Sequence, residues 1–135
     1  MTDEIAANAV DVMASLNRRA AEVAASVGVS AVTDVTGFSL LGHAIEMADG
    51  AGLGLELRMN SVPVLPGALD TLSAGIAPGA TRRNLEHFGC RVQWGHGLTD
   101  VQRMLVGDPQ TSGGLLLATA PERVDALLDG LKQSG

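Results

Sequence analysis

Thr33-Asp34-Val35-Thr36-Gly37-Phe38 is the most informative segment of this sequence. It closes the apolar run 29–33, which we expect to be a short buried strand, and it leads into a helical pattern at 37–49. A strand that ends in an acid, a hydroxyl and a glycine places a carboxylate beside a helix N-terminus, where a metal ion or a phosphate can bind. The sequence therefore predicts a strand–turn–helix unit that presents Asp34.

A second polar turn lies far downstream and also adjoins an apolar strand. It reads Asp108-Pro109-Gln110-Thr111-Ser112-Gly113-Gly114 and precedes the predicted strand 115–119. Two glycine-bearing turns at the mouths of apolar strands suggest one shared anion or metal site. The second turn is equally well explained as a structural turn that orders the strand after it.

Each residue of these turns has an alternative role. From the residues alone, Asp34 is as good a helix cap as a metal ligand, because a carboxylate accepts hydrogen bonds from free amides at a helix start. Gly37 allows close backbone approach to a phosphate. Plain turn chemistry is the better interpretation for Thr33 and Thr36. The candidate nucleotide contacts are Thr36, Gly37, Thr111, Ser112 and Gly113.

Composition narrows the class of protein. The 135 residues form one ordinary domain, with 46% hydrophobic but only 2% aromatic residues, so the core is aliphatic. The net charge of -6 and the single lysine, Lys132, argue against nucleic acid, anionic membranes and a Walker-type phosphate loop. Cys90 is the only cysteine, and no apolar run is long enough to span a bilayer. We expect a cytoplasmic protein.

The periodicity predicts alternating helices and strands. We expect a helix at 3–27 that Gly28 stops, and a strand at 53–59 with alternating leucines. Shorter helical segments are predicted at 68–73, 82–87 and 99–106, an extended segment at 91–94, and a final helix that Pro121 opens. With about four strands, this pattern favours a layered α/β or α+β domain with a mixed β-sheet.

Several polar residues outside the two turns have ordinary explanations. His43 is best interpreted as a buried, hydrogen-bonded histidine in the second helix, and Cys90 as a buried or half-buried small hydrophobe. Arg82 and Arg83 are predicted to be a solvated surface pair, although arginine forks also match phosphate oxygens. The other two histidines lie in loop-like sequence, with no spacing that suggests a metal site.

The order of the motifs resembles the C-terminal domain of selenophosphate synthetase (selenide, water dikinase), within the aminoimidazole ribonucleotide synthetase-like superfamily. The resemblance runs over most of the chain. The segments that carry it are Thr33-Asp34-Val35-Thr36-Gly37-Phe38, Leu40-Leu41-Gly42-His43, Val62-Pro63-Val64-Leu65-Pro66-Gly67, Gly79-Ala80-Thr81 with Asn84, and Asp108-Pro109-Gln110-Thr111-Ser112-Gly113-Gly114-Leu115-Leu116.

The resemblance implies an enzyme that uses Mg²⁺ and ATP to convert selenide and water into selenophosphate, AMP and phosphate. It implies a layered α/β/α domain with a mixed sheet, in which Asp34 corresponds to a magnesium ligand. It also implies a homodimer whose N-terminal domain carries the catalytic lysine and the cysteine or selenocysteine.

The chain departs from this family pattern in three places. The catalytic N-terminal domain is missing, the last strands of the family domain are missing after Gly135, and Ser39 stands where glycine is more usual. We therefore expect 1–135 to be a single C-terminal-type domain, inactive alone, with an exposed apolar patch that promotes self-association. A noncatalytic dimerisation or docking module, and the equivalent domain of a related small-molecule kinase, remain the alternatives.

Overall fold

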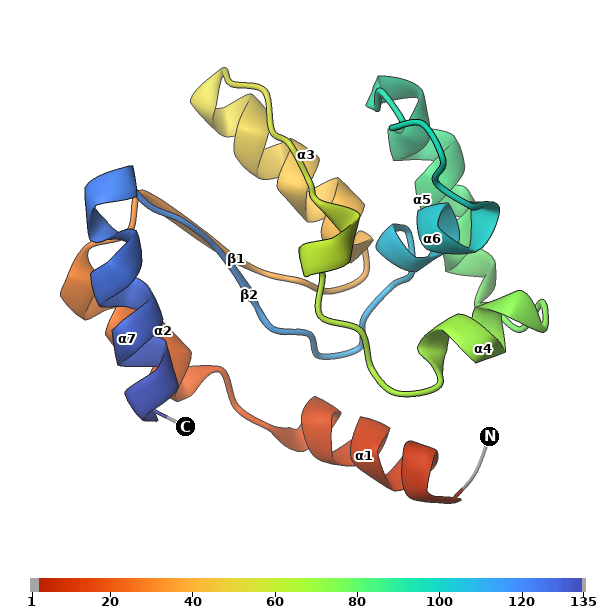
Figure 1. Cartoon of the computed structure of the whole chain (residues 1–135), viewed down its shortest axis with the longest axis horizontal. Coiled ribbons are helices and arrows are strands. Elements are labelled where there is room, and N and C mark those ends of the chain that lie inside the picture. The colour runs from red at the N-terminus through yellow and green to blue at the C-terminus, as the bar shows by residue number, and fades with distance from the viewer. Residues whose placement is uncertain (1–2, 135) are drawn as a thin grey trace.

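The computed structural model describes residues 3–134, and helices flank a small central sheet (Figure 1). The sheet consists of β1 (Ala31–Asp34) and β2 (Leu115–Ala118), which are antiparallel. In the register of the two strands, Ala31 lies opposite Ala118 and Asp34 lies opposite Leu115. The strand that leads into the first polar turn therefore ends opposite the start of the strand that follows the second polar turn.

One helical layer is formed by two helices that are far apart in the sequence. In it, α2 (Arg18–Val27) packs beside α7 (Val124–Ser134), as Figure 1 shows. The two helices approach closely, since a Cβ added at Gly130 would lie 2.7 Å from Cγ1 of Val23. Gly28 ends α2 with φ of 77°, so the predicted glycine stop is confirmed.

The opposite layer contains the main hydrophobic core. It is formed by α3 (Ser39–Ala51), α4 (Ala68–Ser73), α5 (Gly79–Phe88) and α6 (Asp100–Val106). The buried side chains of Leu41, Phe88 and Val106 form its centre. Within residues 3–134 there are also three short 3-10 helices: η1 (Met59–Ser61), η2 (Gly89–Arg91) and η3 (Pro121–Arg123).

The predicted helix 3–27 is in fact two helices. α1 (Asp3–Ala14) ends one turn before α2 begins at Arg18. Asn17 lies at the break, and its side-chain amide donates a 2.9 Å hydrogen bond to the carbonyl of Gly113, far away in sequence. Helical periodicity is the same on both sides of the break, so this tertiary contact leaves no signal in the pattern.

The predicted strand 53–59 is wrong. Its residues have no regular structure before η1, and Leu53 and Leu55 are 71% and 49% exposed. A strand needs a partner, and in residues 3–134 β1 and β2 pair only with each other. The α+β class is confirmed, but the described sheet has two antiparallel strands rather than about four mixed ones.

The remaining helix and strand predictions differ mainly at their boundaries. The predicted turn 82–87 is part of the longer α5, and the buried strand predicted at 29–33 lies at 31–34 with Val32 53% exposed. The capping box of Thr99 and Gln102 at the start of α6 is confirmed. Val92, after η2, is extended, so residues 92–94 are a connector rather than a strand.

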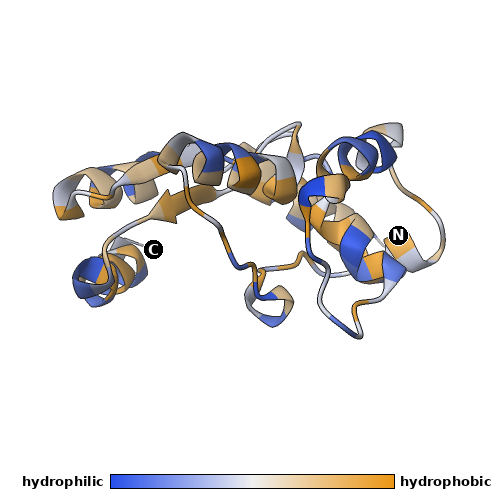
Figure 2. Cartoon of the chain, turned by 90° about the horizontal axis from the view of Figure 1, so that it is seen from above, coloured by the Kyte–Doolittle hydropathy of each residue, from blue (hydrophilic) through white to orange (hydrophobic). Residues whose placement is uncertain are grey.

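Large apolar side chains remain exposed over much of the molecule. Figure 2 shows the hydrophobic colour along the sheet as well as within the helical layers. Leu16 is 84% exposed between α1 and α2, and Ile76 after α4 is 66% exposed. Exposed apolar side chains are therefore numerous, while the single apolar patch and the self-association that it would promote stay predictions.

Two glycines of α3 make a matched test of core packing. A Cβ at Gly42 would lie 2.6 Å from Cε2 of Phe88 and 2.8 Å from Cβ of Phe38, whereas nothing lies within 4 Å at Gly50. Gly42 is therefore required for the close packing of α3 against Phe88 of α5. We expect Gly42→Ala to lower the free energy of unfolding by about 1–3 kcal/mol. Gly50→Ala should raise it by roughly 0.5–1 kcal/mol through helix propensity. Urea unfolding followed by circular dichroism measures both, and equal changes would contradict this packing.

Candidate functional site

The two polar turns lie side by side at one end of the sheet. Beyond the β1–β2 ladder, the amide of Val35 donates to the carbonyl of Gly114 at 2.9 Å, and the amide of Gly113 donates to the carbonyl of Val35 at 3.1 Å. One residue further, the amide of Gln110 donates to the carbonyl of Thr36 at 3.0 Å. The structure thus brings together the two motifs, which are far apart in sequence.

Asp34 is exposed at the last position of β1. No side-chain hydrogen bond or ion pair within residues 3–134 engages its carboxylate, and α3 begins with Phe38 at its N-cap position and no side-chain cap. The capping role that the sequence left open is therefore not what this structure shows. An exposed carboxylate without a protein partner is instead available to a cation.

Thr36 and His43 connect the first turn to α3. The Thr36 hydroxyl lies 3.2 Å from Nε2 of His43, and Nδ1 of His43 lies 3.1 Å from a carboxylate oxygen of Glu46. His43 is 9% exposed, so the prediction of a buried and hydrogen-bonded histidine is confirmed. The partners of His43 were not predicted, although the i, i+3 spacing of His43 and Glu46 was readable in the sequence.

Asn84 fastens the motifs to α5, a role that sequence reasoning missed. Its buried side-chain amide donates to the carbonyls of Gly37, at 3.0 Å, and Gly107, at 3.1 Å. The fully buried Thr81 hydroxyl donates to the Asp108 carboxylate at 2.7 Å. Polar residues on the inward face of a predicted helix were the available signal, since buried polar groups are almost always hydrogen-bonded.

The other predicted candidates take varied positions. Gly113 is half-buried against Val35, Ser112 is half-buried, and Thr111 and Gly37 are exposed. Arg82 and Arg83 are exposed, as predicted. The prediction for Cys90 is wrong: its side chain is exposed after the end of α5, where its thiol lies 3.4 Å from the carbonyl of His87. His87 belongs to α5 rather than to a loop.

Burial raises the pKa of Asp108, and the hydrogen bond from Thr81 partly opposes this rise. A raised pKa means that the folded state binds the proton more tightly than the unfolded chain does. Protonated Asp108 therefore contributes to the free energy of unfolding. This contribution is fully present below the ordinary aspartate pKa and is lost as pH rises through the higher pKa of the folded state. We expect Asp108→Asn to become less destabilising relative to the wild type as pH rises through that window, measured by urea unfolding at several pH values. The opposite trend would contradict the burial effect.

The metal-binding capacity of the site is small. Within residues 3–134, no group of three or more histidine, cysteine, aspartate or glutamate side chains is placed to hold a metal ion. Mg²⁺ typically takes one or two protein carboxylates and completes its shell with water and phosphate oxygens. The single free carboxylate of Asp34 fits such a shared site and does not fit a site built from this domain alone.

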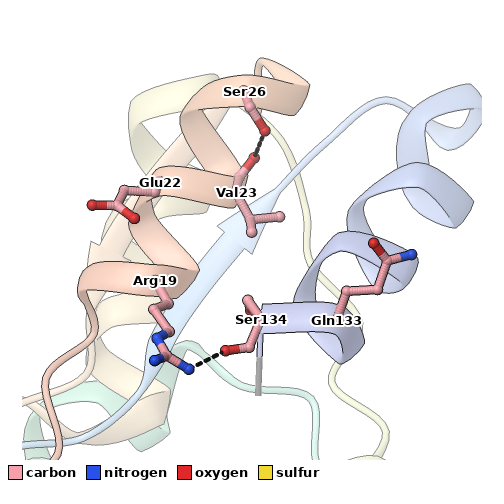
Figure 3. A pocket seen from close by; sticks show the side chains of 6 residues that line it. All are labelled: Arg19, Glu22, Val23, Ser26, Gln133 and Ser134. Atoms are coloured by element: carbon pink, nitrogen blue, oxygen red, sulfur yellow. Dashed lines mark hydrogen bonds between the residues drawn. The ribbon is translucent and has the colours of Figure 1, made fainter.

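Hollows are found on both sides of β1 in the part of the chain that the structure describes. One lies between β1 and α3, beside the turn, and His43 and Glu46 line it. The other lies between α2 and α7, where the Arg19 guanidinium donates to the backbone carbonyl of Ser134 at 2.9 Å (Figure 3). The second hollow is lined by Arg19, Glu22, Val23, Ser26, Gln133 and Ser134, none of which belongs to the two motifs.

A membrane-spanning helix is not found among residues 3–134, where every helix is too short or too polar to cross a bilayer.

Known proteins are similar in sequence to this domain. Selenide, water dikinase of Shewanella sp. (strain MR-7) is 47% identical over 122 residues, which cover 90% of this chain and 34% of the relative. The corresponding values for selenide, water dikinase of Burkholderia pseudomallei (strain K96243) are 48% over 120 residues, 89% and 34%. The chain thus spans about a third of the length of these curated relatives, and its resemblance to selenophosphate synthetase is confirmed.

The family model for the AIR synthase related protein, C-terminal domain, matches residues 4–135, nearly the whole chain. The α+β structure with its small antiparallel sheet agrees with this assignment. The chain therefore belongs to the AIR synthase related protein family, as its C-terminal domain.

Proposed function

We propose that this chain is the C-terminal domain of an ATP-dependent selenophosphate synthetase, in which Asp34 contributes one ligand to Mg²⁺. The reaction would convert selenide, ATP and water into selenophosphate, AMP and phosphate. The observation that carries the proposal is the exposed Asp34 carboxylate, unpartnered within residues 3–134, at the junction of the two polar turns. When bound, Mg²⁺ neutralises charge on the phosphates of ATP.

The remaining residues of the junction would form one wall of a cleft. Gly37 and Thr111 are exposed on the two turns, with Thr36, Ser112 and Gly113 beside them. This wall would bind and orient a nucleotide, and the family resemblance assigns the catalytic lysine and cysteine or selenocysteine to another domain. We therefore propose that the isolated domain is inactive, and that an N-terminal domain supplies the catalytic groups and further metal ligands.

The family resemblance extends this proposal to the whole enzyme. We propose a cytoplasmic homo-oligomer that uses ATP and selenide, in which the N-terminal domain covers part of the exposed apolar surface. Burial of this surface by the N-terminal domain would explain why apolar side chains such as Leu53 and Ile76 are solvent-exposed in this chain. A noncatalytic docking module is the competing function, and the same exposed surface favours it.

The test replaces the matching C-terminal third of the Shewanella selenide, water dikinase with this chain. At 47% identity over the matched region, the domain interface should be largely retained. We expect the chimera to make selenophosphate and AMP, detected by phosphorus NMR, while this chain alone makes neither. ADP as the nucleotide product would indicate a related kinase. A folded chimera without turnover would favour the docking module.

A further inference from the structure

Three polar side chains lie in line from α3 to the first turn. Glu46 contacts Nδ1 of His43 at 3.1 Å, and Nε2 of His43 contacts the Thr36 hydroxyl at 3.2 Å. Glu46 has 54% of its side chain exposed, whereas His43 has only 11% of its side chain exposed. The line therefore begins at solvent in the hollow beside β1 and ends two residues after Asp34.

The chemistry of Glu46 fixes the direction of both hydrogen bonds. An ionised carboxylate only accepts hydrogen bonds, so Nδ1 of His43 must carry the proton and donate it. In the neutral imidazole, Nε2 is then an acceptor, and the Thr36 hydroxyl must be the donor. The Thr36 hydroxyl thereby donates its proton to the hydrogen bond with His43. Only the lone pairs of the hydroxyl oxygen remain available to a ligand.

Packing holds both ends of the His43–Thr36 hydrogen bond. The His43 ring lies 5.7 Å from the Phe38 ring, centroid to centroid, and Phe38 in turn packs edge-on against Phe88. The Thr36 carbonyl accepts from the amides of Ser39, at 2.9 Å, and Gln110, at 3.0 Å. The turn and the ring are therefore both positioned before any ligand arrives.

We infer that His43, supported by Glu46, is a positioning residue that presents Thr36 Oγ1 as a hydrogen-bond acceptor. A phosphate oxygen is itself an acceptor and gains nothing from such a group. A water molecule on a divalent cation is a donor, so Thr36 is suited to the hydration shell of the cation at Asp34. This inference rests on the proposed role of Asp34 in binding Mg²⁺.

The first test is the tautomer of His43 in the 135-residue chain, labelled with ¹⁵N at histidine. Long-range proton–nitrogen NMR at mildly alkaline pH should show that Nδ1 of His43 is protonated and Nε2 is unprotonated. The exposed His87 and His96 serve as internal references. Thr36→Val should shift the Nε2 resonance of His43, and Thr36→Ser should restore it. The opposite tautomer, a doubly protonated ring, or no response to Thr36→Val overturns the inference.

The second test measures the Mg²⁺ concentration for half-maximal turnover in the chimera. Outer-shell partners of a metal are typically worth 10–100-fold in metal affinity, so His43→Ala and Thr36→Val should each raise this concentration by about 10–100-fold. The double variant should be no worse than either single one, because both remove the same interaction. Thr36→Ser should stay near wild type, as should Glu86→Gln on the exposed face of α5.

The two tests separate the possible failures. An active chimera in which neither variant changes the Mg²⁺ requirement overturns this inference and leaves the proposed function intact. A folded but inactive chimera overturns the proposed function, and the role of Thr36 at the cation with it. In that case the NMR result still decides how His43 and Thr36 are bonded.

Discussion

In the active chimera, Asp34→Asn is expected to lower turnover by roughly 30- to 1,000-fold, which corresponds to about 2–4 kcal/mol of lost charge stabilisation around the metal. The substitution keeps the size of the side chain but removes its charge, and asparagine is a weaker ligand for a hard cation. Because Asp34 is exposed and its carboxylate makes no bond within residues 3–134, the folded domain should be indifferent to the change.

The control for Asp34→Asn is Asp70→Asn on the exposed surface of α4. That variant should retain full turnover. The free energy of unfolding of both variants should remain within about 0.5 kcal/mol of the wild type, as for most surface substitutions. Activity measured over a range of Mg²⁺ concentrations is the decisive experiment. If Asp34→Asn is fully active at limiting Mg²⁺, Asp34 is not a ligand.

Gly113→Ala is expected to destabilise the domain by about 3 kcal/mol, at the upper end of the usual cost of overpacking. The new Cβ would collide with the carbonyl oxygen of Val35, and it would also lie 3.3 Å from Cβ of Gln110. That carbonyl oxygen accepts the hydrogen bond of the Gly113 amide, so the backbone can relieve the collision only by separating the two turns. A loss of this size is a large part of typical domain stability, about 5–15 kcal/mol.

The adjacent glycine supplies the matched control. Nothing lies within 4 Å of a Cβ added at Gly114. Gly114→Ala should therefore be neutral or stabilise the domain by up to about 1 kcal/mol, because alanine restricts the unfolded chain. Urea denaturation of both variants, at matched protein concentration, gives the comparison. Similar free energies of unfolding for the two would show that the turns are not packed against each other as described.

The sequence was most informative where chemistry is local. A glycine stop at Gly28, the capping box at Thr99 and the buried histidine at position 43 each depend on residues a few positions apart, and all three were predicted. The contacts that close the site are of another kind. Asn17 contacts Gly113, 96 residues away, and Asn84 contacts Gly37, 47 residues away, and no periodicity records such contacts.

The wrong prediction of a strand at 53–59 has a related cause. Alternating leucines show that an extended segment would have one apolar face. They do not show whether the fold provides an apolar surface for that face to pack against. In the described chain it is absent, and Leu53, Leu55 and Leu57 stay exposed. The two motifs were found because their residue types are unusual, whereas the roles of Asp34 and the nucleotide candidates remain predictions for experiment.

The pairing of β1 with β2 has a consequence for how this domain is made. The two strands come from opposite ends of the chain, as do α2 and α7, which lie side by side in one layer. On the ribosome, α3 to α6 can associate early, whereas β1 must wait until β2 has emerged. Contacts between distant segments slow folding because the intervening loop has to close first. The junction that presents Asp34 therefore belongs to the last part of the domain to assemble, and in a nascent chain it should stay unformed until β2 has emerged.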